Sequence, residues 1–377
     1  MLVIASGCGE AIPEWCSAPQ GGEVRVADEP VAWTNPPDLQ LAWRLDGSKP
    51  GGELLVPVSA AIDETAGRIA LVDFRLREII VIAFDGQLVG RWGRAGAGPG
   101  ELTAPFAAAW RTDGRLIVYD PARSKLVVFD SAGTTLDDVP VEPAFTAALG
   151  GGARWLHLDG SGLLLAQPGP PLRGDASSRV HVVVRGGVVG QPVDTVAQRD
   201  VPVVLVRGAA PITAPGWPVP LAALHGDSIL AVAAGPEYLV HVYRNGVPSH
   251  TICRSVDPLP LDEGESTPQE PGIPDEISDA VARAEPPPTP ARIGRLDIDA
   301  ERRLWVQRDR PRPLAGLDGF VGRPGALFDV FDAAGAYLGE VRMPDNVRFL
   351  GATRDLIIGL ESDELDVLSV VALRPEW

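Results

Sequence analysis

Histidine is the residue of this sequence best suited to bind a metal or carry a proton near neutral pH, because its pKa lies at about 6.5. The chain has five histidines, at His157, His181, His225, His241 and His250. No two stand at the short spacing typical of metal ligands, and no Gly-x-Ser-x-Gly segment supplies a serine nucleophile. His157 and His225 remain candidate ligands, since each lies near the end of an apolar segment that we expect to form a strand.

Three carboxylates could serve a calcium ion, which binds oxygen ligands in flexible geometry. They are Asp63, Asp297 and Asp299. Each lies where an expected strand meets a turn, and Asp side chains at such junctions commonly accept hydrogen bonds from the turn's own amides. We therefore expect these residues to cap turns, and we predict neither a metal site nor a cofactor.

Three arginines form the most specific ligand-binding hypothesis. Arg154, Arg292 and Arg348 each fall at the start of an expected strand. If these strands lie side by side, the three guanidinium groups could converge on a carboxylate or phosphate and bind it by paired hydrogen bonds. The alternative is that the arginines pair with neighbouring Asp or Glu residues or point to solvent.

A sequence repeat predicts the strands that must position these residues. Residues 67–86 and 114–133 share an apolar run, a polar turn, a second apolar run ending in Phe-Asp, and a Gly turn. Tyr119 follows Val72 by 47 positions and Phe129 follows Phe84 by 45, a period typical of propeller blades. Four weaker copies follow, so the sequence predicts about six units of adjacent antiparallel strands.

Each unit is preceded by a further short strand candidate, whose small and apolar residues suit the crowded axis of a propeller. The six candidates are residues 58–62, 106–110, 154–158, 221–225, 293–298 and 348–353. The last unit lacks sequence for an outer strand, and residues 39–45 could fill that place and close the ring, which would hide exposed strand edges. With 42 Gly and 37 Pro, the composition also favours many short strands. We predict an all-β, six-bladed β-propeller of four-stranded antiparallel blades.

One segment carries a family resemblance. Residues 91–102 read Arg-Trp-Gly-Arg-Ala-Gly-Ala-Gly-Pro-Gly-Glu-Leu, followed by Pro105 and the strand 113–120. This resembles the Gly-Pro-Gly-Glu-Phe hallmark of exported bacterial six-bladed propellers related to NHL repeats, with Leu102 in place of Phe. Residues 297–306 resemble a blade opening of the same family, with Arg302 where Gly is common. The resemblance covers residues 39–377 and implies the fold. It does not imply a function, because such propellers host unrelated activities.

Metal-dependent lactonases of the gluconolactonase type also have six blades, and they hold a divalent ion with carboxylates and Asn side chains. This chain has only Asn35, Asn245 and Asn346. Asn35 precedes the propeller, and the other two fall in a turn and a connection. The lactonase ligand set therefore cannot be assembled. Peptidyl lyases built on NHL-type propellers use His ligands instead, for which only His157 and His225 are candidates.

The first eight residues, Met-Leu-Val-Ile-Ala-Ser-Gly-Cys, are typical of the end of a lipoprotein signal, in which Cys8 would be acylated. The basic segment is missing and the apolar one is short, so residues 1–20 are either a truncated signal or a frayed terminus. If Cys8 is acylated, Cys16 and Cys253 remain as the only pair for a disulfide, and the sequence does not decide whether they bond. This segment predicts export, to the periplasm or outer membrane.

The propeller domain is expected over residues 21–377, with a Pro-rich acidic insertion at about 257–290. Within it, residues 275–284 could form a short helix, since Ile277 and Val281 fall on one helical face. The acidic residues of the insertion either bind a cation or a basic partner, or they form a solvated loop. They are Asp262, Glu263, Glu265, Glu270, Asp275 and Glu276.

Net charge and hydropathy narrow the function. The formal net charge is −17, so no excess of Lys and Arg is present to track nucleic-acid phosphates. No apolar stretch of about 18 residues exists, which leaves a lipid anchor as the expected link to a membrane. We expect a monomeric binding or scaffold propeller of the cell envelope that recognises a protein, peptide or glycan through its loop face. The alternative is a metal-assisted lyase or hydrolase with its site in the central channel.

Overall fold

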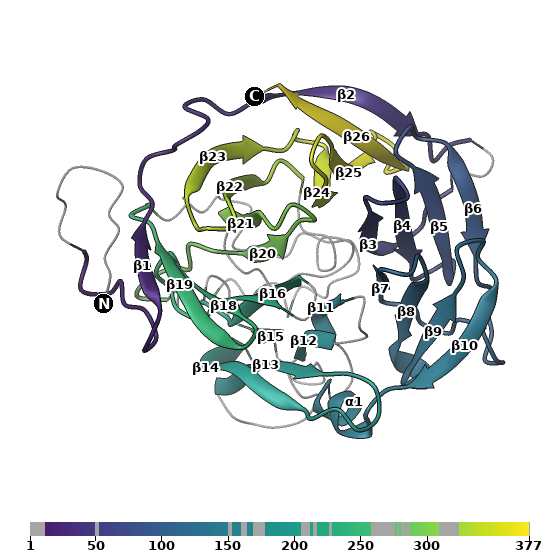
Figure 1. Cartoon of the computed structure of the whole chain (residues 1–377), viewed down its shortest axis with the longest axis horizontal. Coiled ribbons are helices and arrows are strands. Elements are labelled where there is room, and N and C mark those ends of the chain that lie inside the picture. The colour runs from purple at the N-terminus through teal and green to yellow at the C-terminus, as the bar shows by residue number, and fades with distance from the viewer. Residues whose placement is uncertain are drawn as a thin grey trace.

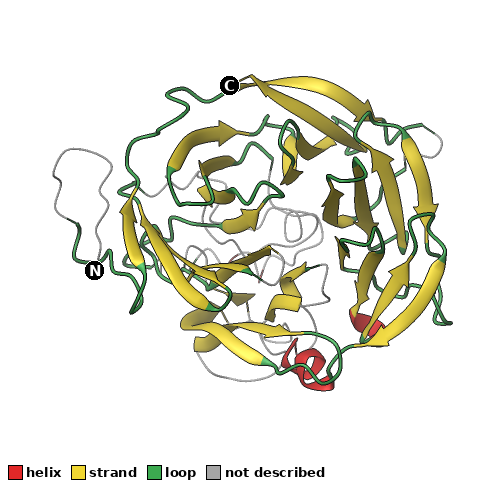
Figure 2. Ribbon diagram, in the orientation of Figure 1, coloured by secondary structure: helices red, strands yellow, loops and turns green. Residues whose placement is uncertain are grey.

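The computed structural model contains strands arranged around a central axis, with short connections between them (Figures 1 and 2). It describes residues 12–49, 53–149, 153–159, 164–168, 178–204, 212–213, 217–225, 228–257, 276, 279, 283, 287–308 and 324–376. The chain is an all-β propeller of mainly antiparallel, four-stranded sheets.

The described strands form six hydrogen-bonded sheets; four of them are built from consecutive strands, and the other two each include one strand from the N-terminal part of the chain. The first blade contains β3 (Pro57–Asp63), β4 (Arg68–Asp73), β5 (Glu78–Ala83) and β6 (Leu88–Trp92). The second contains β7 (Ala107–Trp110), β8 (Leu116–Asp120), β9 (Lys125–Phe129) and β10 (Thr135–Pro140). The third contains β11 (Ala153–Leu158), β12 (Leu164–Pro168), β13 (Ser178–Gly186), β14 (Asp194–Val204) and β15 (Ile212–Thr213).

The remaining sheets follow the same order from the axis outward. The fourth blade contains β16 (Leu221–His225), β17 (Ile229–Ala233), β18 (Leu239–Arg244) and β19 (Val247–Cys253), with β1 (Glu23–Val26) added at its outer edge. The fifth contains β20 (Arg295–Ile298), β21 (Leu304–Arg308), β22 (Leu327–Phe331) and β23 (Tyr337–Arg342). The closing sheet contains β24 (Val347–Ala352), β25 (Ile357–Ser362), β26 (Leu368–Glu376) and β2 (Asp38–Leu45).

The expectation of six blades, each of four antiparallel strands, needs correction. Five blades are detected, and the closing sheet differs because its fourth strand comes from the other end of the sequence. Two blades also depart from the expected four antiparallel strands: β15 extends the third, and β1 extends the fourth in parallel orientation. The repeat could not reveal these additions, since they lie outside its period.

The predicted innermost strands are confirmed. All six candidate segments overlap β3, β7, β11, β16, β20 and β24, each of which is the strand of its sheet nearest the axis (Figure 1). The predicted closing strand is confirmed as well, because β2 pairs antiparallel with β26 along its whole length, from Asp38 opposite Glu376 to Leu45 opposite Val370.

The segment before β2, residues 16–37, forms a strap around the outside of the propeller. Strand β1 pairs with β19 of the fourth blade, and Val31 and Trp33 then donate backbone hydrogen bonds to the carbonyls of Tyr337 and Leu338 in β23 of the fifth. The strap therefore runs along the outer strands of two blades before β2 completes the closing sheet (Figure 1).

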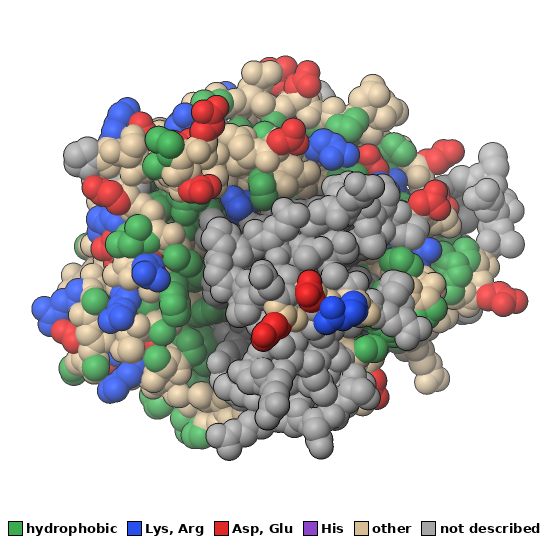
Figure 3. All heavy atoms as spheres, turned by 180° about the vertical axis from the view of Figure 1, so that it is seen from behind, with side chains coloured by type: hydrophobic (Ala, Val, Ile, Leu, Met, Phe, Trp, Pro, Cys, Tyr) green, Lys and Arg blue, Asp and Glu red, His purple; other side chains and the backbone are tan. Residues whose placement is uncertain are grey.

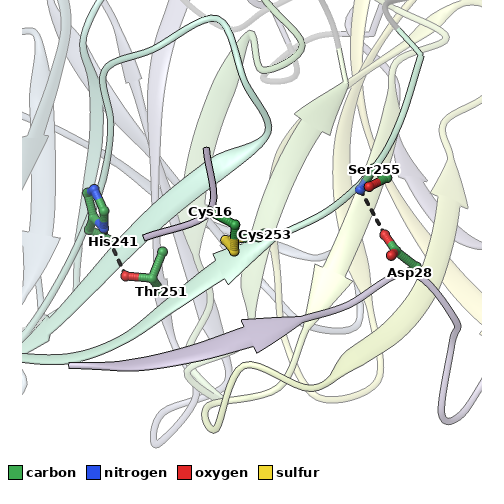
Figure 4. The surroundings of a disulfide bond; sticks show 6 residues. All are labelled: Cys16, Asp28, His241, Thr251, Cys253 and Ser255. Atoms are coloured by element: carbon green, nitrogen blue, oxygen red, sulfur yellow. Dashed lines mark hydrogen bonds between the residues drawn. A yellow bond between two sulfur atoms is a disulfide. The ribbon is translucent and has the colours of Figure 1, made fainter. Parts of the chain in front are cut away.

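A disulfide between Cys16 and Cys253 fastens the start of this strap to the end of β19 (Figure 4). Both cysteines are buried, and Val24 of β1 packs against them. Farther along, Asp28 accepts a hydrogen bond from the amide of Ser255 at 2.8 Å. The disulfide joins residues 237 positions apart, so it removes much of the conformational freedom of the unfolded chain. The sequence left this pairing open, and the structure settles it.

The hydrophobic core lies between neighbouring sheets. One cluster joins Ile69 and Ile80 of the first blade to Ile358 and Val370 of the closing sheet. Other clusters join the first blade to the second and the fifth blade to the closing sheet. Since each sheet buries its faces against its neighbours, no blade has a complete core of its own.

A buried ion pair reinforces the contact between the fourth and fifth blades. Arg254, directly after the disulfide, pairs with Asp329 of β22, whose side chain is fully buried. The guanidinium also lies 3.9 Å from the ring centroid of Tyr337, and the Tyr337 hydroxyl donates to Asp329 at 3.2 Å. Burial raises the pKa of Tyr337, and the negative charge of Asp329 raises it further.

Helices are few in the described part of the chain. The α-helix α1 (Pro143–Leu149) packs Phe145 against Tyr119, and the short 3-10 helix η1 (Pro121–Arg123) follows β8 (Figure 2). Of the predicted helix at 275–284, only Glu276, Asp279 and Arg283 are among the described residues, and the rest of the acidic insertion from 258 to 286 lies outside them, as does Cys8. Within the described residues, no helix has the length and apolarity needed to cross a membrane.

Candidate functional site

The two ends of the propeller axis carry different kinds of connection. Each inner strand runs in the same direction along the axis, so all six begin at one face and end at the other. We call the face where they begin the loop face; it also carries the turns from the second to the third strand. The opposite turn face carries the turns from the first to the second strand and from the third to the fourth.

On the turn face, side chains tie each blade to the next. Arg68 pairs with Asp63 at 3.0 Å and donates to the carbonyls of Gly114 and Ser131 in the second blade, at 2.9 and 3.0 Å. Arg303 likewise pairs with Asp299 at 2.7 Å and donates to a carbonyl of the closing sheet. These arginines fix the relative positions of neighbouring turns.

Of the three carboxylates weighed as calcium ligands, Asp63 and Asp299 cap turns as expected, whereas Asp297 lies within β20 and caps no turn. Asp63 accepts from the amide of Ala66 at 3.0 Å, and Asp299 accepts from the amide of Arg303 and the indole N–H of Trp305, both at 2.8 Å. Asp297 pairs with Arg295 at 2.8 Å. Among the residues that the structure describes, no group of three or more His, Cys, Asp or Glu side chains is placed to hold a metal ion.

His225, at the turn face, is a half-buried imidazole that could bind a ligand or a proton. It is the last residue of β16; its backbone is part of the ladder with β17, but its imidazole makes no hydrogen bond with the described part of the chain. Burial lowers its pKa and Arg302 lowers it further, while Asp299, Asp159 and Asp297 oppose the shift. The imidazole is therefore neutral at physiological pH and available to accept a proton or a hydrogen bond.

His157, the second candidate ligand, is placed only through its backbone. It lies in β11, next to the end of that strand, and its side chain is outside the described residues. Asp159, which follows β11, is buried and contributes to the charge around His225. Residues at the ends of β11 and β20, namely Asp159, Asp299 and Arg302, therefore lie close enough to His225 for their charges to act on its pKa.

An interblade crevice adjoins this cluster. It is lined by apolar side chains of β17, β18, β19 and β21 and by the polar residues Arg244, His250, Arg302 and Asp332. Arg302 also contributes to the charge around His225, so it links the crevice to the end of β16. His250 is almost fully buried and lies 3.1 Å from the Ser249 hydroxyl.

The three arginines predicted to bind an anion lie on the loop face, but each described side chain already has protein partners. Arg292 donates to the carbonyls of Val256 at 2.8 Å and Pro236 at 3.2 Å. Arg348 donates to the Ser362 hydroxyl at 2.9 Å. Arg154 belongs to β11, and its side chain lies outside the described residues. Because the Arg154 side chain is not described, the convergence of the three stays a prediction.

Two buried carboxylates of the loop face carry a role that our sequence reasoning missed. Asp73 and Asp120 end the second strands of the first two blades and are fully buried. Asp120 accepts from the amides of Thr103 and Ala104, at 2.7 and 3.1 Å. Each carboxylate therefore holds the segment that leads into its own inner strand. The signal was present, since both Asp residues occupy the same place in the repeat.

Comparisons with known proteins give distant structural likenesses. No family model matches the sequence, and a search of curated proteins finds no match. Among solved structures, a protein named for its assumed export from Bacteroides fragilis is 12% identical with a TM-score of 0.49, covering 94% of this chain and 99% of that one. A member of the DUF4221 family from Bacteroides vulgatus is 11% identical with a TM-score of 0.49, covering 91% and 99%. A gluconolactonase from Xanthomonas campestris is 15% identical with a TM-score of 0.43, covering 93% and 98%. At these values the likenesses carry no conclusion about function, and the fold assignment rests on the sheets themselves.

The buried His250 predicts an acid-sensitive step in stability. Burial, helped by the charges of Arg244 and Arg25, lowers the pKa of His250 from 6.5 to about 4. Because the folded-state pKa is depressed, the stabilisation is present above pH 6.5 and is lost as pH falls toward about 4, which amounts to about 3 kcal/mol. Urea unfolding across this interval should show a smaller loss for His250→Gln than for the wild type. Equal losses in both proteins would contradict the assignment.

Proposed function

We propose that this protein is a binding or scaffold propeller of the bacterial cell envelope, which recognises a protein, peptide or glycan partner through its loop face. The observation that carries the proposal is the unequal length of the connections at the two faces. Between β19 and β20 lie 41 residues, and between β21 and β22 lie 18. On the turn face, the connections between described strands have at most seven residues. Long connections on a rigid scaffold are where binding surfaces usually form.

The described surface combines charged and apolar side chains, which suits a partner that carries both. Seen from behind, acidic, basic and hydrophobic side chains alternate around the rim (Figure 3). On the side of β3 to β10, hydrophobic side chains gather inside this charged rim. A surface of alternating charges with local apolar area is typical of protein-binding sites rather than of nucleic-acid sites.

Export to the envelope is the second part of the proposal. The disulfide between Cys16 and Cys253 supports it, because such bonds persist in oxidising compartments such as the periplasm. We propose that Cys8 is acylated and anchors the protein to a membrane. We also propose that residues 21–377 form one domain, a monomeric six-bladed ring related to NHL repeats, in which the closing sheet serves as the sixth blade.

Site-specific photo-crosslinking tests the loop face directly. A photoreactive amino acid replaces Leu55 or Leu365 on the loop face, whose side chains are 52% and 83% exposed. The matched control replaces Val247 on the turn face, which is 63% exposed. In cells that export the protein, we expect discrete adducts at the two loop-face positions and none at Val247. Equal adducts at Val247, or none at any position, would contradict the proposal.

A second candidate function is a metal-assisted lyase or hydrolase at the turn face. It is favoured by His225, a neutral and half-buried imidazole without a hydrogen-bond partner in the described part of the chain, beside three carboxylates near the axis. Such a group could ligate a divalent ion together with His157, or accept a proton from a substrate.

Elemental analysis of the purified protein separates this candidate from the scaffold proposal. The scaffold proposal predicts no stoichiometric divalent metal in the wild type. About one equivalent of zinc or calcium that is lost in His225→Ala would favour the enzyme. The matched control is His241→Ala, because His241 lies on β18, where its Nδ1 is 2.9 Å from the Thr251 hydroxyl. Metal retained by the His225 variant would exclude His225 as a ligand.

A further inference from the structure

The turn between β4 and β5 on the loop face is held rigidly from inside. The buried carboxylate of Asp73 accepts four backbone amides, those of Leu55 at 2.8 Å, Val56 at 3.1 Å, Arg75 at 3.0 Å and Leu76 at 2.9 Å. A carboxylate with this many donors fixes both the turn and the segment leading into β3. The backbone of the turn is therefore organised before any partner arrives.

The outward side of the same turn combines charge with apolar surface. Arg75 and Arg77 are exposed, and neither guanidinium forms an ion pair or hydrogen bond with the described residues. Beside them, Phe74 is 37% exposed and Leu55 is 52% exposed. The backbones of Phe74 and Leu55 run close together, because the amide of Phe74 donates to the carbonyl of Val56 at 2.9 Å and the amide of Leu55 donates to Asp73.

Arg77 also adopts an unusual backbone conformation. Its φ is 59°, in the left-handed region that usually favours Gly or Asn. Ser124 occupies the corresponding place in the second blade, with a φ of 49°. The turn geometry is thus shared between blades, whereas the arginine at this position is particular to the first.

The acidic residues around this turn are already engaged. Glu78 pairs with Arg91, which also lies 3.8 Å from Glu53. Glu101 pairs with Arg94 at 2.7 Å. Among the described residues, the two guanidinium groups of Arg75 and Arg77 therefore have no acidic partner, although the formal net charge of the chain is −17. An anionic ligand would supply what the surroundings of Arg75 and Arg77 lack.

We propose that Leu55, Phe74, Arg75 and Arg77 form a docking patch for an acidic peptide segment that carries an aromatic or aliphatic side chain. Its carboxylates would pair with the two arginines, and its apolar side chain would pack on Phe74 and Leu55. A membrane surface fits less well, because attraction to anionic lipids usually takes a cluster of four or more basic residues. An anionic glycan would leave the apolar part of the patch unused.

This inference deepens the proposed function, since it names the partner class for one part of the loop face. It is tested by fluorescence anisotropy with a fluorescein-labelled, glutamate-rich peptide containing Phe. The variant is Arg75→Glu with Arg77→Glu. The matched control is Arg111→Glu with Arg115→Glu, which makes the same charge change at exposed positions of the turn face.

We expect the wild type and the control to bind the peptide alike, and the patch variant to bind at least about tenfold more weakly, because two charge-assisted contacts are lost. Binding should weaken as salt rises from about 0.05 to about 0.3 M. Phe74→Ser, and a peptide with Ser in place of Phe, should each weaken binding without changing the salt dependence.

Three results would overturn the inference: no binding by the wild type, equal loss in the control variant, or binding of phosphatidylglycerol vesicles in place of the peptide. Thermal unfolding of each variant shows whether it is folded, and Arg75→Gln with Arg77→Gln replaces a variant that is not. If crosslinking at Leu365 succeeds while the peptide fails, the scaffold proposal stands and this inference alone is wrong. If both fail, both are wrong.

Discussion

The pairing of β2 with β26 is the constraint on which the rest of this structure depends. If one sheet of a propeller lacks its outer strand, the strand edge left exposed can pair with other chains. Here β2 supplies the missing strand over eight residues. Trp43 of β2 also donates its indole N–H to the carbonyl of Phe84 in the first blade, which links the closing sheet to its neighbour.

The strap adds a second level of closure. The disulfide fixes its beginning, β1 follows β19, and two backbone hydrogen bonds follow β23 before β2 starts. Closure, strap and interblade core therefore act together, since the apolar clusters between sheets form only when neighbouring sheets are held at the right distance. The outcome is a rigid body in which the two faces can differ freely in their connections.

The two faces of the propeller have different roles. Arg68 and Arg303 donate from one turn to the next across the turn face, so its short turns are used for cohesion. On the loop face, Asp73 and Asp120 anchor the segments that lead into inner strands and leave the outward side of each turn free to vary. His225 is the exception on the turn face, because the charges of three carboxylates act on its imidazole and yet that side chain forms no hydrogen bond within the described residues.

Much of the fold could be predicted from the sequence, and the failures have physical causes. The inner strands were predictable because each is a short segment with apolar residues at a regular place in the repeat, and the closing strand was predictable because the last unit lacked sequence for its outer strand. Strand β1 was not, because four residues pairing in parallel with a distant strand leave no local pattern. The partners of Arg292 were equally invisible, since they are backbone carbonyls that any residue type supplies. Turn capping by Asp63 and Asp299 was predictable from their position alone.

Hydrogen exchange followed by mass spectrometry tests ring closure most directly. The account predicts that amides of β26 and β2 exchange as slowly as those of β4 and β5 in the first blade, because closure makes the ring open as one unit. Exchange of β2 and its partner amides within seconds, while β4 and β5 stay protected, would contradict it. In that case the closing sheet would be a loosely attached edge, and the N-terminal strand would not hold the propeller together.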